Sequence, residues 1–349
     1  MTYELSDKIK NLKPYNAVTG DYKIRMDANE SFINPGETLQ EEFLSAVASI
    51  KFNRYPNPMA TELCEGFARY YGIDPEMVVA GNGSDELISI IMGAFLRPGD
   101  KVMSYSPDFS MYQFYGNLYD KTNLVIDKKM DMILTAADVL DAVMEYKPAA
   151  VILSNPCSPT SLVMSREDIL KIVENSNNLV IIDEAYMDFS DQSIIKVAEK
   201  YDNLILLKTC SKALGLAAIR LGFAVASKPI ARALHAVRSP YNVNAITQEI
   251  GRVIFSHPDY IKKSIEKIKE ARDQLYSGLL QLEPNKSIRR IIKPDTNFVF
   301  IELSNAEYVY KELKKYSIIV RQFGDFLRIT TGTKEENEAL IQAISKILV

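Results

Sequence analysis

The chain has 349 residues, of which 25% are charged and 47% hydrophobic, and its formal net charge is −4. This length allows one large domain plus a smaller one, and the small net charge argues against a nucleic-acid partner. No stretch approaches the ~20 consecutive apolar residues of a membrane-spanning helix. The N-terminus lacks the charged-then-apolar pattern of a signal peptide, so we expect a cytoplasmic protein with no membrane partner.

Cysteine and histidine usage argues against a metal site. The three cysteines, Cys64, Cys157 and Cys210, include no C-x-x-C pair, and we expect them to be free thiols. Only two histidines occur, His235 and His257, and a helical or surface position is the better interpretation of both. The sequence therefore predicts no metal, and it disfavours both metal catalysis and a Ser-His-Asp triad.

Short apolar runs alternate with amphipathic segments between residues 22 and 227. Unbroken apolar runs are typical of strands that are covered on both faces, as in a parallel sheet. The amphipathic segments have the periodicity of helices. The predicted strands are Met77–Ala80, Val102–Tyr105, Ala149–Leu153, Leu179–Ile182, Leu204–Leu207 and Phe223–Ala226, and the predicted helices are Asp85–Leu96, Ala136–Tyr146 and Arg166–Glu174.

The pattern changes after residue 228, where a long charged helical stretch, Asp259–Leu282, is followed by short strands and a final helix, Lys334–Leu348. The short strands are Ile288–Ile292, Phe298–Ile301, Ile318–Val320 and Phe326–Ile329. We therefore predict an α/β protein. Its large domain, residues 30–227, has a mostly parallel sheet sandwiched by helices, and a smaller α+β domain combines residues 1–29 with residues 228–349.

Polar clusters follow four of the apolar runs. In an open α/β sheet, ligands bind beyond the carboxyl ends of the strands. We therefore expect these clusters to meet on one edge of the sheet. The clusters are Gly81–Glu86, Ser154–Thr160, Asp183–Tyr186 and Lys208–Lys212.

For three of these clusters, the residues alone leave both a structural and a functional interpretation open. Gly81–Glu86 suits a phosphate at a helix start, but it matches neither the dinucleotide nor the Walker pattern, and a capped helix without a ligand explains it equally well. A buried Asp183 needs a partner, which is a helix start, an arginine, or a ring nitrogen that becomes a cation. Lys212 precedes small apolar residues and could form a Schiff base, although a lone lysine is more often a surface residue.

As a set, these residues resemble the fold-type I pyridoxal-phosphate enzymes, and within that group they are most similar to the histidinol-phosphate aminotransferase family. The similarity follows the family's order along nearly the whole chain, from Leu12 to Thr333. It is carried by Leu12-Lys13-Pro14-Tyr15, Asp27-Ala28-Asn29-Glu30, Arg54-Tyr55-Pro56, Gly81-Asn82-Gly83-Ser84-Asp85-Glu86, Asn155-Pro156, Pro159-Thr160, Asp183-Glu184-Ala185-Tyr186, Ser211-Lys212, Arg220 and Leu327-Arg328-Ile329-Thr330-Thr331-Gly332-Thr333.

The resemblance implies pyridoxal 5'-phosphate as the cofactor and gives roles to the residues that would hold it. Lys212 would form the Schiff base and shuttle a proton, Asp183 would pair with the pyridine nitrogen, and Tyr186 would hydrogen-bond the ring hydroxyl. Phe109 would stack on the ring. The phosphate would be held by Gly83, Ser84, Asp85, Thr209, Ser211 and Arg220.

The resemblance also implies the partners. Tyr55 would reach the phosphate from the neighbouring subunit, which implies a homodimer with shared active sites. The substrates would be small molecules, an amino donor and a 2-oxo acid, bound by Arg321, Arg328, Tyr15 and Asn29. The implied reaction converts histidinol phosphate and 2-oxoglutarate into imidazole acetol phosphate and glutamate, a step of histidine biosynthesis.

Ser158 departs from the family pattern, which usually has an asparagine there whose amide bonds the ring hydroxyl. Serine is shorter, so either Ser158 reaches the ring through a water, or Asn155 compensates, or the ring electronics and the rate are altered. Three alternative functions are left open: a lyase resembling threonine-phosphate decarboxylase, an aminotransferase for aromatic or other amino acids, and a non-catalytic binding protein of the same fold.

Overall fold

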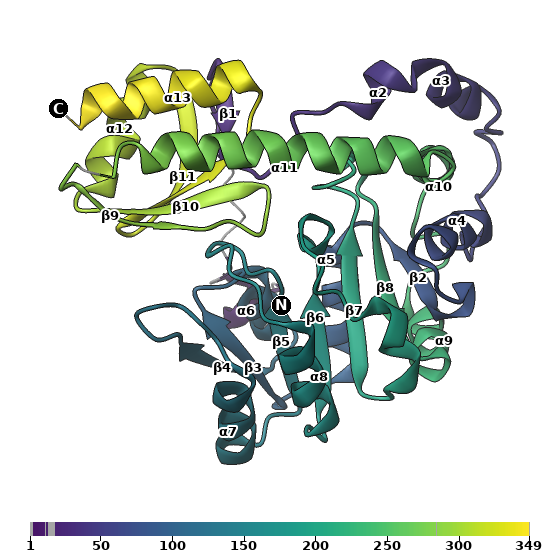
Figure 1. Ribbon diagram of the computed structural model, residues 1–349. Helices are drawn as coiled ribbons and strands as arrows, with labels where there is room; N and C mark the ends of the chain where they lie inside the picture. Colours follow the sequence, from purple (N-terminus) through teal and green to yellow (C-terminus); the bar gives the residue numbers. More distant parts are fainter. Residues whose placement is uncertain (1–2, 11, 13–17, 284, 349) are drawn as a thin grey trace.

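The computed structural model describes residues 3–10, 12, 18–283 and 285–348, and two β-sheets organise this part of the chain (Figure 1). The larger sheet consists of β2 (Val78–Gly81), β3 (Lys101–Ser106), β4 (Thr122–Asp127), β5 (Ala150–Ser154), β6 (Leu179–Asp183), β7 (Leu204–Thr209) and β8 (Gly222–Ala226). Its strand order is β2-β8-β7-β6-β5-β3-β4. The strands from β3 to β7 pair in parallel, whereas β8 is antiparallel to both β7 and β2. The prediction of a mostly parallel sheet is confirmed.

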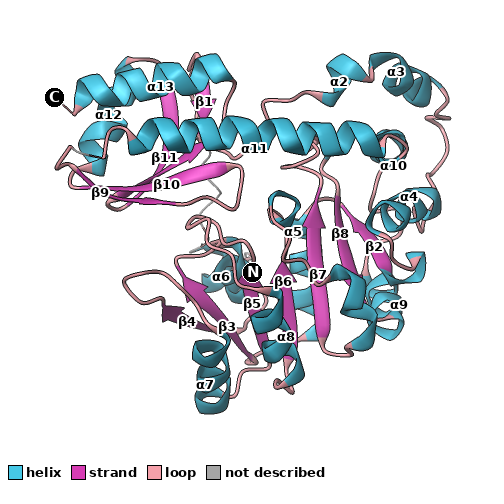
Figure 2. Cartoon of the chain, viewed as in Figure 1, coloured by secondary structure: helices cyan, strands magenta, loops and turns pink. Residues whose placement is uncertain are grey.

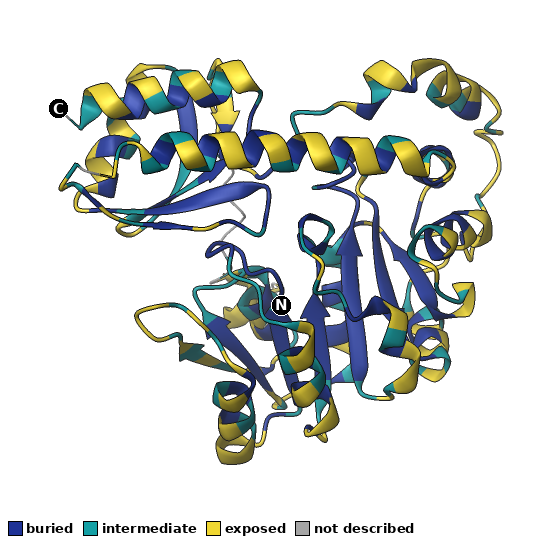
Figure 3. Cartoon of the chain, in the orientation of Figure 1, coloured by how far each residue is buried: buried dark blue, intermediate teal, exposed yellow. Residues whose placement is uncertain are grey.

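Hydrophobic cores on both faces of this sheet explain its unbroken apolar strands. Along β7, Leu204 and Leu206 join one buried cluster while Ile205 and Leu207 join another, because successive side chains point to opposite faces. Figure 3 shows the strands buried between helices whose outer surfaces are exposed. The helices around the sheet are α4 (Thr61–Tyr71), α5 (Ser84–Ile90) with its continuation η2 (Ile91–Phe95), α6 (Met111–Leu118), α7 (Ala136–Tyr146), α8 (Arg166–Glu174) and α9 (Lys228–Val237).

The edge strand β4 was not predicted from the sequence. It pairs only with β3, and none of its six residues is buried. A strand at the edge lacks a neighbour on one side and keeps polar residues at exposed positions. It therefore lacks the continuous apolar run that identified the central strands.

The smaller sheet combines the start and the end of the chain. It consists of β1 (Ile24–Met26), β9 (Ile288–Ile292), β10 (Phe298–Leu303), β11 (Ile318–Phe323) and β12 (Phe326–Thr330), in the order β1-β11-β12-β10-β9. Two helices, α12 (Ala306–Lys315) and α13 (Lys334–Ile347), contribute Val309 and Leu340 to its core. Because β1 pairs in parallel with β11, residues 24–26 pack with this sheet. Lys8, in contrast, donates to Leu118 and Asp120 beside α6, so the assignment of residues 1–29 to the smaller domain stays a prediction.

A single long helix, α11 (Pro258–Leu280), runs from one sheet to the other (Figure 2). Its residues Ile261 and Ile268 belong to the core of the larger sheet, and Leu275 and Leu279 belong to the core of the smaller one. The preceding helix α10 (Ala245–Phe255) also packs into the core of the larger sheet. The domain boundary at residue 227 stays a prediction, and these contacts favour a boundary within α11.

Short elements complete the described chain: α1 (Asp7–Lys10), α2 (Pro35–Thr38), α3 (Gln40–Ala48), η1 (Pro75–Met77), η3 (Met187–Phe189), η4 (Ile195–Lys200) and η5 (Ala217–Ile219). None of the described helices has the length and apolar character needed to cross a membrane. Cys64, Cys157 and Cys210 are all free and buried. Over the same residues, no group of three or more histidine, cysteine, aspartate or glutamate side chains could hold a metal ion.

Candidate active site

The turn between β2 and α5 packs tightly against β8 and Arg220. Gly83 has a φ of +81°, and a Cβ atom there would lie 2.8 Å from Nη2 of Arg220. A Cβ atom at Gly222 would lie 2.4 Å from the backbone nitrogen of Ser84. Glycine is therefore required at both positions. The turn brings the first N–H groups of α5 next to a guanidinium group, an arrangement that suits an anion.

Thr209 at the end of β7 and two side chains from the loop that follows complete this site, which we call the anion cradle (Gly83, Ser84, Asp85, Thr209, Ser211 and Arg220). Arg220 donates from Nη2 to Oδ2 of Asp85 at 3.2 Å and from Nη1 to Oγ of Ser211 at 3.4 Å. The backbone nitrogen of Ser211 donates to Oγ1 of Thr209 at 3.2 Å. The structure thus brings together the six residues that the sequence predicts around a phosphate group.

Asp183 lies at the carboxyl end of β6 and is only 4% exposed. Its Oδ1 accepts a hydrogen bond from the backbone nitrogen of Ala185 at 3.1 Å, and its Oδ2 accepts one from the hydroxyl of Tyr112 at 2.9 Å. Burial raises the pKa of this carboxyl to about 7, although the hydrogen bonds from Tyr112 and Ala185 lower it, and the negative Asp108 raises it further. A cationic partner offsets the energetic cost of ionising a buried carboxyl. Asp183 therefore suits a ligand that carries positive charge.

The segment Asp27–Asn29, which directly follows β1, reaches two of the predicted catalytic residues. Nζ of Lys212 donates to the carbonyl oxygen of Ala28 at 2.9 Å. Nδ2 of the buried Asn29 donates to the hydroxyl oxygen of Tyr186 at 2.8 Å. Asn29 has a φ of 54°, a left-handed conformation that asparagine adopts more readily than most residues. Neighbouring residues of one segment therefore hold Lys212 and Tyr186 close together.

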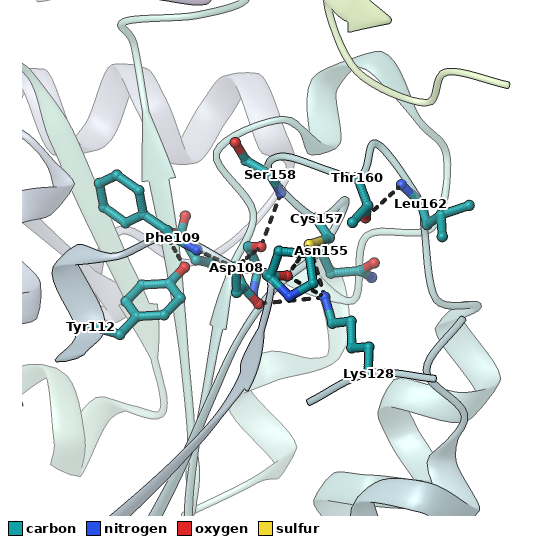
Figure 4. Close-up of polar contacts among 12 residues, drawn as sticks. Asp108, Phe109, Tyr112, Lys128, Asn155, Cys157, Ser158, Thr160 and Leu162 are labelled. Atoms are coloured by element: carbon teal, nitrogen blue, oxygen red, sulfur yellow. Dashed lines mark hydrogen bonds and ion pairs between the residues drawn. The ribbon is translucent and has the colours of Figure 1, made fainter. Parts of the chain in front are cut away.

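Phe109, two residues before the first residue of α6, is held by a buried polar cluster (Figure 4). Its backbone nitrogen donates to Oδ1 of Asp108 at 2.7 Å, and its ring meets that of Tyr112 edge to face with centroids 5.5 Å apart. Asp108 also accepts a short hydrogen bond from the hydroxyl of Ser154 and forms an ion pair with Lys128 at 4.0 Å. Figure 4 shows the Asp108 carboxylate between Phe109 and Lys128, so one buried charge pair fixes the backbone that carries the aromatic ring.

Ser158 is tied to an arginine of the smaller sheet. Its backbone nitrogen donates to Oγ of Ser154 at 3.2 Å, and its own Oγ accepts from Nη1 of Arg328 at 3.2 Å. The side-chain amide of Asn155 bonds both the oxygen and the nitrogen of the Met164 backbone. The amide of Asn155 is therefore used to hold a turn, and compensation by Asn155 for the short Ser158 side chain finds no support.

Arg321 and Arg328 lie directly opposite each other on β11 and β12. Arg328 donates from Nη2 to the carbonyl oxygen of Asp27 at 2.7 Å, and its guanidinium lies 5.5 Å from the ring of Phe298 and 5.4 Å from that of Phe323. Like charges directly opposite on paired strands repel each other. An anion beside the two guanidinium groups would relieve this repulsion, so the pair is suited to a carboxylate or a phosphate.

Of the two remaining predicted residues, only Tyr55 lies in the described part of the chain, and it is not joined to this site. The side chain of Tyr55 is 80% exposed and stacks on Tyr241 with ring centroids 4.5 Å apart. No contact in the described part of the chain joins Tyr55 to Lys212 or Asp183. Tyr15, which the sequence predicts at the substrate, lies outside the described residues.

Sequence analysis missed Tyr112 and the Asp108–Lys128 pair. Tyr112 follows Phe109 by three residues at the start of a helix, and this spacing is the available signal that both side chains face the same way. Lys128 directly follows β4, at the same end of the sheet as the other polar clusters. Because the sequence does not predict β4, it does not place Lys128 at this edge of the sheet.

Comparison with known proteins gives the family. Residues 22–344 match the family described as aminotransferase class I and II. The chain therefore belongs to this family and is an aminotransferase. A curated relative over almost the whole length is the histidinol-phosphate aminotransferase of Clostridium novyi (strain NT), 40% identical over 99% of this chain and 97% of its own length.

Solved structures confirm the predicted fold class. A histidinol-phosphate aminotransferase from Sinorhizobium meliloti, in complex with pyridoxal-5'-phosphate, matches with a TM-score of 0.89 and 20% identity over 100% of this chain and 98% of that one. An L-threonine-O-3-phosphate decarboxylase from Porphyromonas gingivalis matches with a TM-score of 0.78 and 20% identity over 93% of this chain and 99% of that one. At these identities the likeness shows the fold alone, and the fold does not separate a transferase from a lyase.

The raised pKa of Asp183 makes the ligand-free protein less stable as the pH rises. The ordinary value is 3.8 and the folded value about 7, so between them the folded state keeps a proton that the unfolded chain releases. We therefore compare the free energy of unfolding of the wild-type protein with that of Asp183→Asn. The wild-type value minus the variant value should fall by about 1.4 kcal/mol per pH unit from about pH 5 to about pH 6.5. Denaturant titrations of both proteins measure the difference, and a difference independent of pH would contradict the raised pKa.

Proposed function

We propose that this aminotransferase binds pyridoxal 5'-phosphate covalently at Lys212 and transfers the amino group of histidinol phosphate to 2-oxoglutarate. The buried Asp183 carboxyl is the observation that carries the proposal, because a cationic ring nitrogen would stabilise its ionised form. The anion cradle fits the phosphate of the cofactor. The contacts of Lys212 with Ala28 and of Tyr186 with Asn29 support a single site.

Each of the surrounding residues fits a part of this cofactor. When bound, pyridoxal phosphate supplies an aldehyde that takes up the amino group and a ring that accepts electrons. Lys212 would bind the aldehyde through Nζ and later move a proton at the same atom. Asp183 would keep the ring nitrogen protonated, and Phe109 would cover the ring and exclude water.

Tyr186 would hold the ring hydroxyl of the cofactor. Its hydroxyl oxygen accepts a hydrogen bond from Asn29, which leaves its own O–H to be donated. The family's usual asparagine is replaced by Ser158, whose Oγ is engaged with Arg328. We therefore propose that the Asn29–Tyr186 pair is the main hydrogen-bonding partner of the ring hydroxyl in this chain.

Histidinol phosphate is the proposed amino donor for two reasons. The relative that is 40% identical over nearly the full length is named for that substrate. The opposed guanidinium groups of Arg321 and Arg328 also suit both a dianionic phosphate and a carboxylate. The same pair would bind histidinol phosphate and then 2-oxoglutarate, and the products would be imidazole acetol phosphate and glutamate.

We also propose a homodimer with shared active sites. The stacked rings of Tyr55 and Tyr241 leave a large aromatic surface exposed in the single chain, which is typical of a protein–protein contact. A cleft beside Tyr55 is lined by Arg54, Asn57 and Arg252. In the dimer, Tyr55 would reach the anion cradle of the partner subunit.

The other functions considered are weaker. The relative at 40% identity is a transferase, whereas threonine-phosphate decarboxylase is matched in fold alone. A binding protein without catalysis would need neither a buried carboxyl at Asp183 nor a lysine at residue 212. Both groups are present, and the adjacent residues Ala28 and Asn29 contact Lys212 and Tyr186, respectively.

Borohydride treatment of the holoenzyme tests the cofactor assignment. The protein should absorb in the near-ultraviolet to violet, and reduction should remove this band and leave a modification that peptide mapping locates at Lys212. Lys212→Ala should have no reducible band, whereas Lys200→Ala, which removes an exposed lysine, should keep it. Retention of the reducible band in Lys212→Ala would show that the assignment is wrong.

A product assay tests the reaction. Enzyme mixed with histidinol phosphate and 2-oxoglutarate should form glutamate, and Asp183→Ala should bind the cofactor poorly and form glutamate very slowly, because the ring would lose its charged partner. Near-normal turnover by Asp183→Ala would remove the aspartate from the mechanism. Release of carbon dioxide from threonine phosphate, without glutamate formation, would favour the lyase.

Removal of one guanidinium group tests the substrate site. Arg328→Ala should raise the KM for the anionic substrate strongly, equivalent to ~2–4 kcal/mol of lost binding if the charge pair is well shielded from water. Arg289→Ala is the control, because it removes the same charge from β9 of the same sheet, where Arg289 pairs with Asp325 at 3.3 Å. Steady-state kinetics of both variants measure the KM for the anionic substrate. An unchanged KM in Arg328→Ala would show that the anion does not bind at Arg328.

A further inference from the structure

We infer that Tyr112 is a positioning residue for the proposed reaction, because its hydroxyl stabilises the charge of Asp183 and thereby keeps the ring nitrogen of the cofactor protonated. The effect of Tyr112 on the charge of Asp183 is the first half of this inference, and the protonation of the ring nitrogen is the second. Only the second half rests on the proposed function. The link between Tyr112 and Asp183 is a property of the chain itself, and it can be measured without the cofactor.

Two hydrogen bonds from the protein leave capacity on the Asp183 carboxylate for a further donor. The Tyr112 hydroxyl donates to Oδ2 of Asp183 at 2.9 Å, and the backbone nitrogen of Ala185 donates to Oδ1 at 3.1 Å. Tyr112 is 1% exposed and Asp183 4%, so this hydrogen bond is shielded from bulk solvent. A carboxylate can accept about four hydrogen bonds. The two protein donors therefore fix the plane of the carboxylate and leave capacity for a ring N–H.

Tyr112 is a donor at every working pH. Burial raises the pKa of its phenol well above the ordinary value, and the nearby negative charges of Asp183 and Asp108 raise it further. The phenol therefore keeps its single proton throughout the neutral range. Because that proton points to Asp183, the tyrosine stabilises the ionised carboxylate over the protonated form.

The other charges near Asp183 oppose ionisation. Asp108 and Asp85 are both negative and raise the pKa of its carboxyl, in addition to the larger effect of burial. The hydrogen bonds from Tyr112 and from the Ala185 backbone act in the opposite direction. Without the tyrosine hydroxyl, a proton shared between Asp183 and a ring nitrogen would move toward the carboxyl. The ring would then accept electrons less readily.

The same helix start also carries the aromatic ring that would cover the cofactor. Phe109 and Tyr112 meet edge to face with centroids 5.5 Å apart, and Asp108 holds the backbone nitrogen of Phe109 at 2.7 Å. The short segment from Asp108 to Tyr112 thus carries both the ring that would stack on the cofactor and the hydroxyl that bonds Asp183. Tyr112 would act through Asp183 without itself touching the cofactor.

Carbon-13 NMR of the aspartate carboxyls in the cofactor-free full chain measures the first half of the inference. The Asp183 signal is assigned by its loss in Asp183→Asn. Tyr112→Phe should raise the pKa of Asp183 by about one to two units, because a hydrogen bond to the charged form is removed. Tyr119→Phe is the matched control. Tyr119 lies at the other end of the same helix, and its hydroxyl bonds Ser89 at 2.8 Å. Equal values in wild type and Tyr112→Phe would overturn the inference.

A tyrosine with a fluorinated ring at position 112 makes the test independent of the stability of Tyr112→Phe. Fluorination makes the hydroxyl a stronger donor, so it should lower the pKa of Asp183 and move it opposite to the phenylalanine variant. No change in the pKa would contradict a hydrogen bond that controls the charge of Asp183.

Nitrogen-15 NMR of ring-labelled pyridoxal phosphate in the holoenzyme measures the second half. The ring nitrogen signal should move toward the unprotonated value in Tyr112→Phe and stay in place in Tyr119→Phe. An unchanged signal in Tyr112→Phe would overturn the role in the reaction. A chain that failed the borohydride test at Lys212 would still show the pKa change in the cofactor-free protein, so failure of the proposed function and failure of this inference are distinguishable.

Discussion

The burial of one carboxyl group at the end of β6 is the constraint on which the site depends. Asp183 is removed from water where the central strand of the larger sheet ends, and a buried charge is costly unless it has partners. Because β5 and β7 flank β6, the loop that carries Ser158 and the loop that carries Lys212 lie on its two sides. The topology thus places the amine of Lys212 and a hydrogen-bonding turn around a buried carboxyl.

The segment Asp27–Asn29 links this centre to the smaller sheet. The carbonyl oxygen of Asp27 accepts from Arg328, that of Ala28 accepts from Lys212, and Asn29 bonds both Tyr186 and Thr330 of β12. The arginine that would bind the substrate anion and the lysine that would bind the cofactor are therefore attached to adjacent peptide units. One stretch of backbone thus accepts hydrogen bonds from both side chains.

The sequence predicts those features that depend on local pattern and on topology. The strands β5, β6 and β7 are identified because both of their faces are buried, and the polar residues after them converge because parallel strands end on the same edge. The exposed edge strand β4 lacks this pattern. The bonds from Tyr112 to Asp183 and from Arg328 to Ser158 join residues 71 and 170 positions apart, and side-chain packing between distant elements decides such partners.

The helix α11 belongs to both hydrophobic cores, and this has a consequence for how the protein unfolds. Its 23 residues contribute to the packing of the larger sheet at one end and of the smaller sheet at the other. A helix that loses half of its packing is only marginally stable in water, since most helical stability in proteins comes from tertiary contacts. Melting of either core therefore removes support from the other, and the two sheets are joined into one cooperative unit.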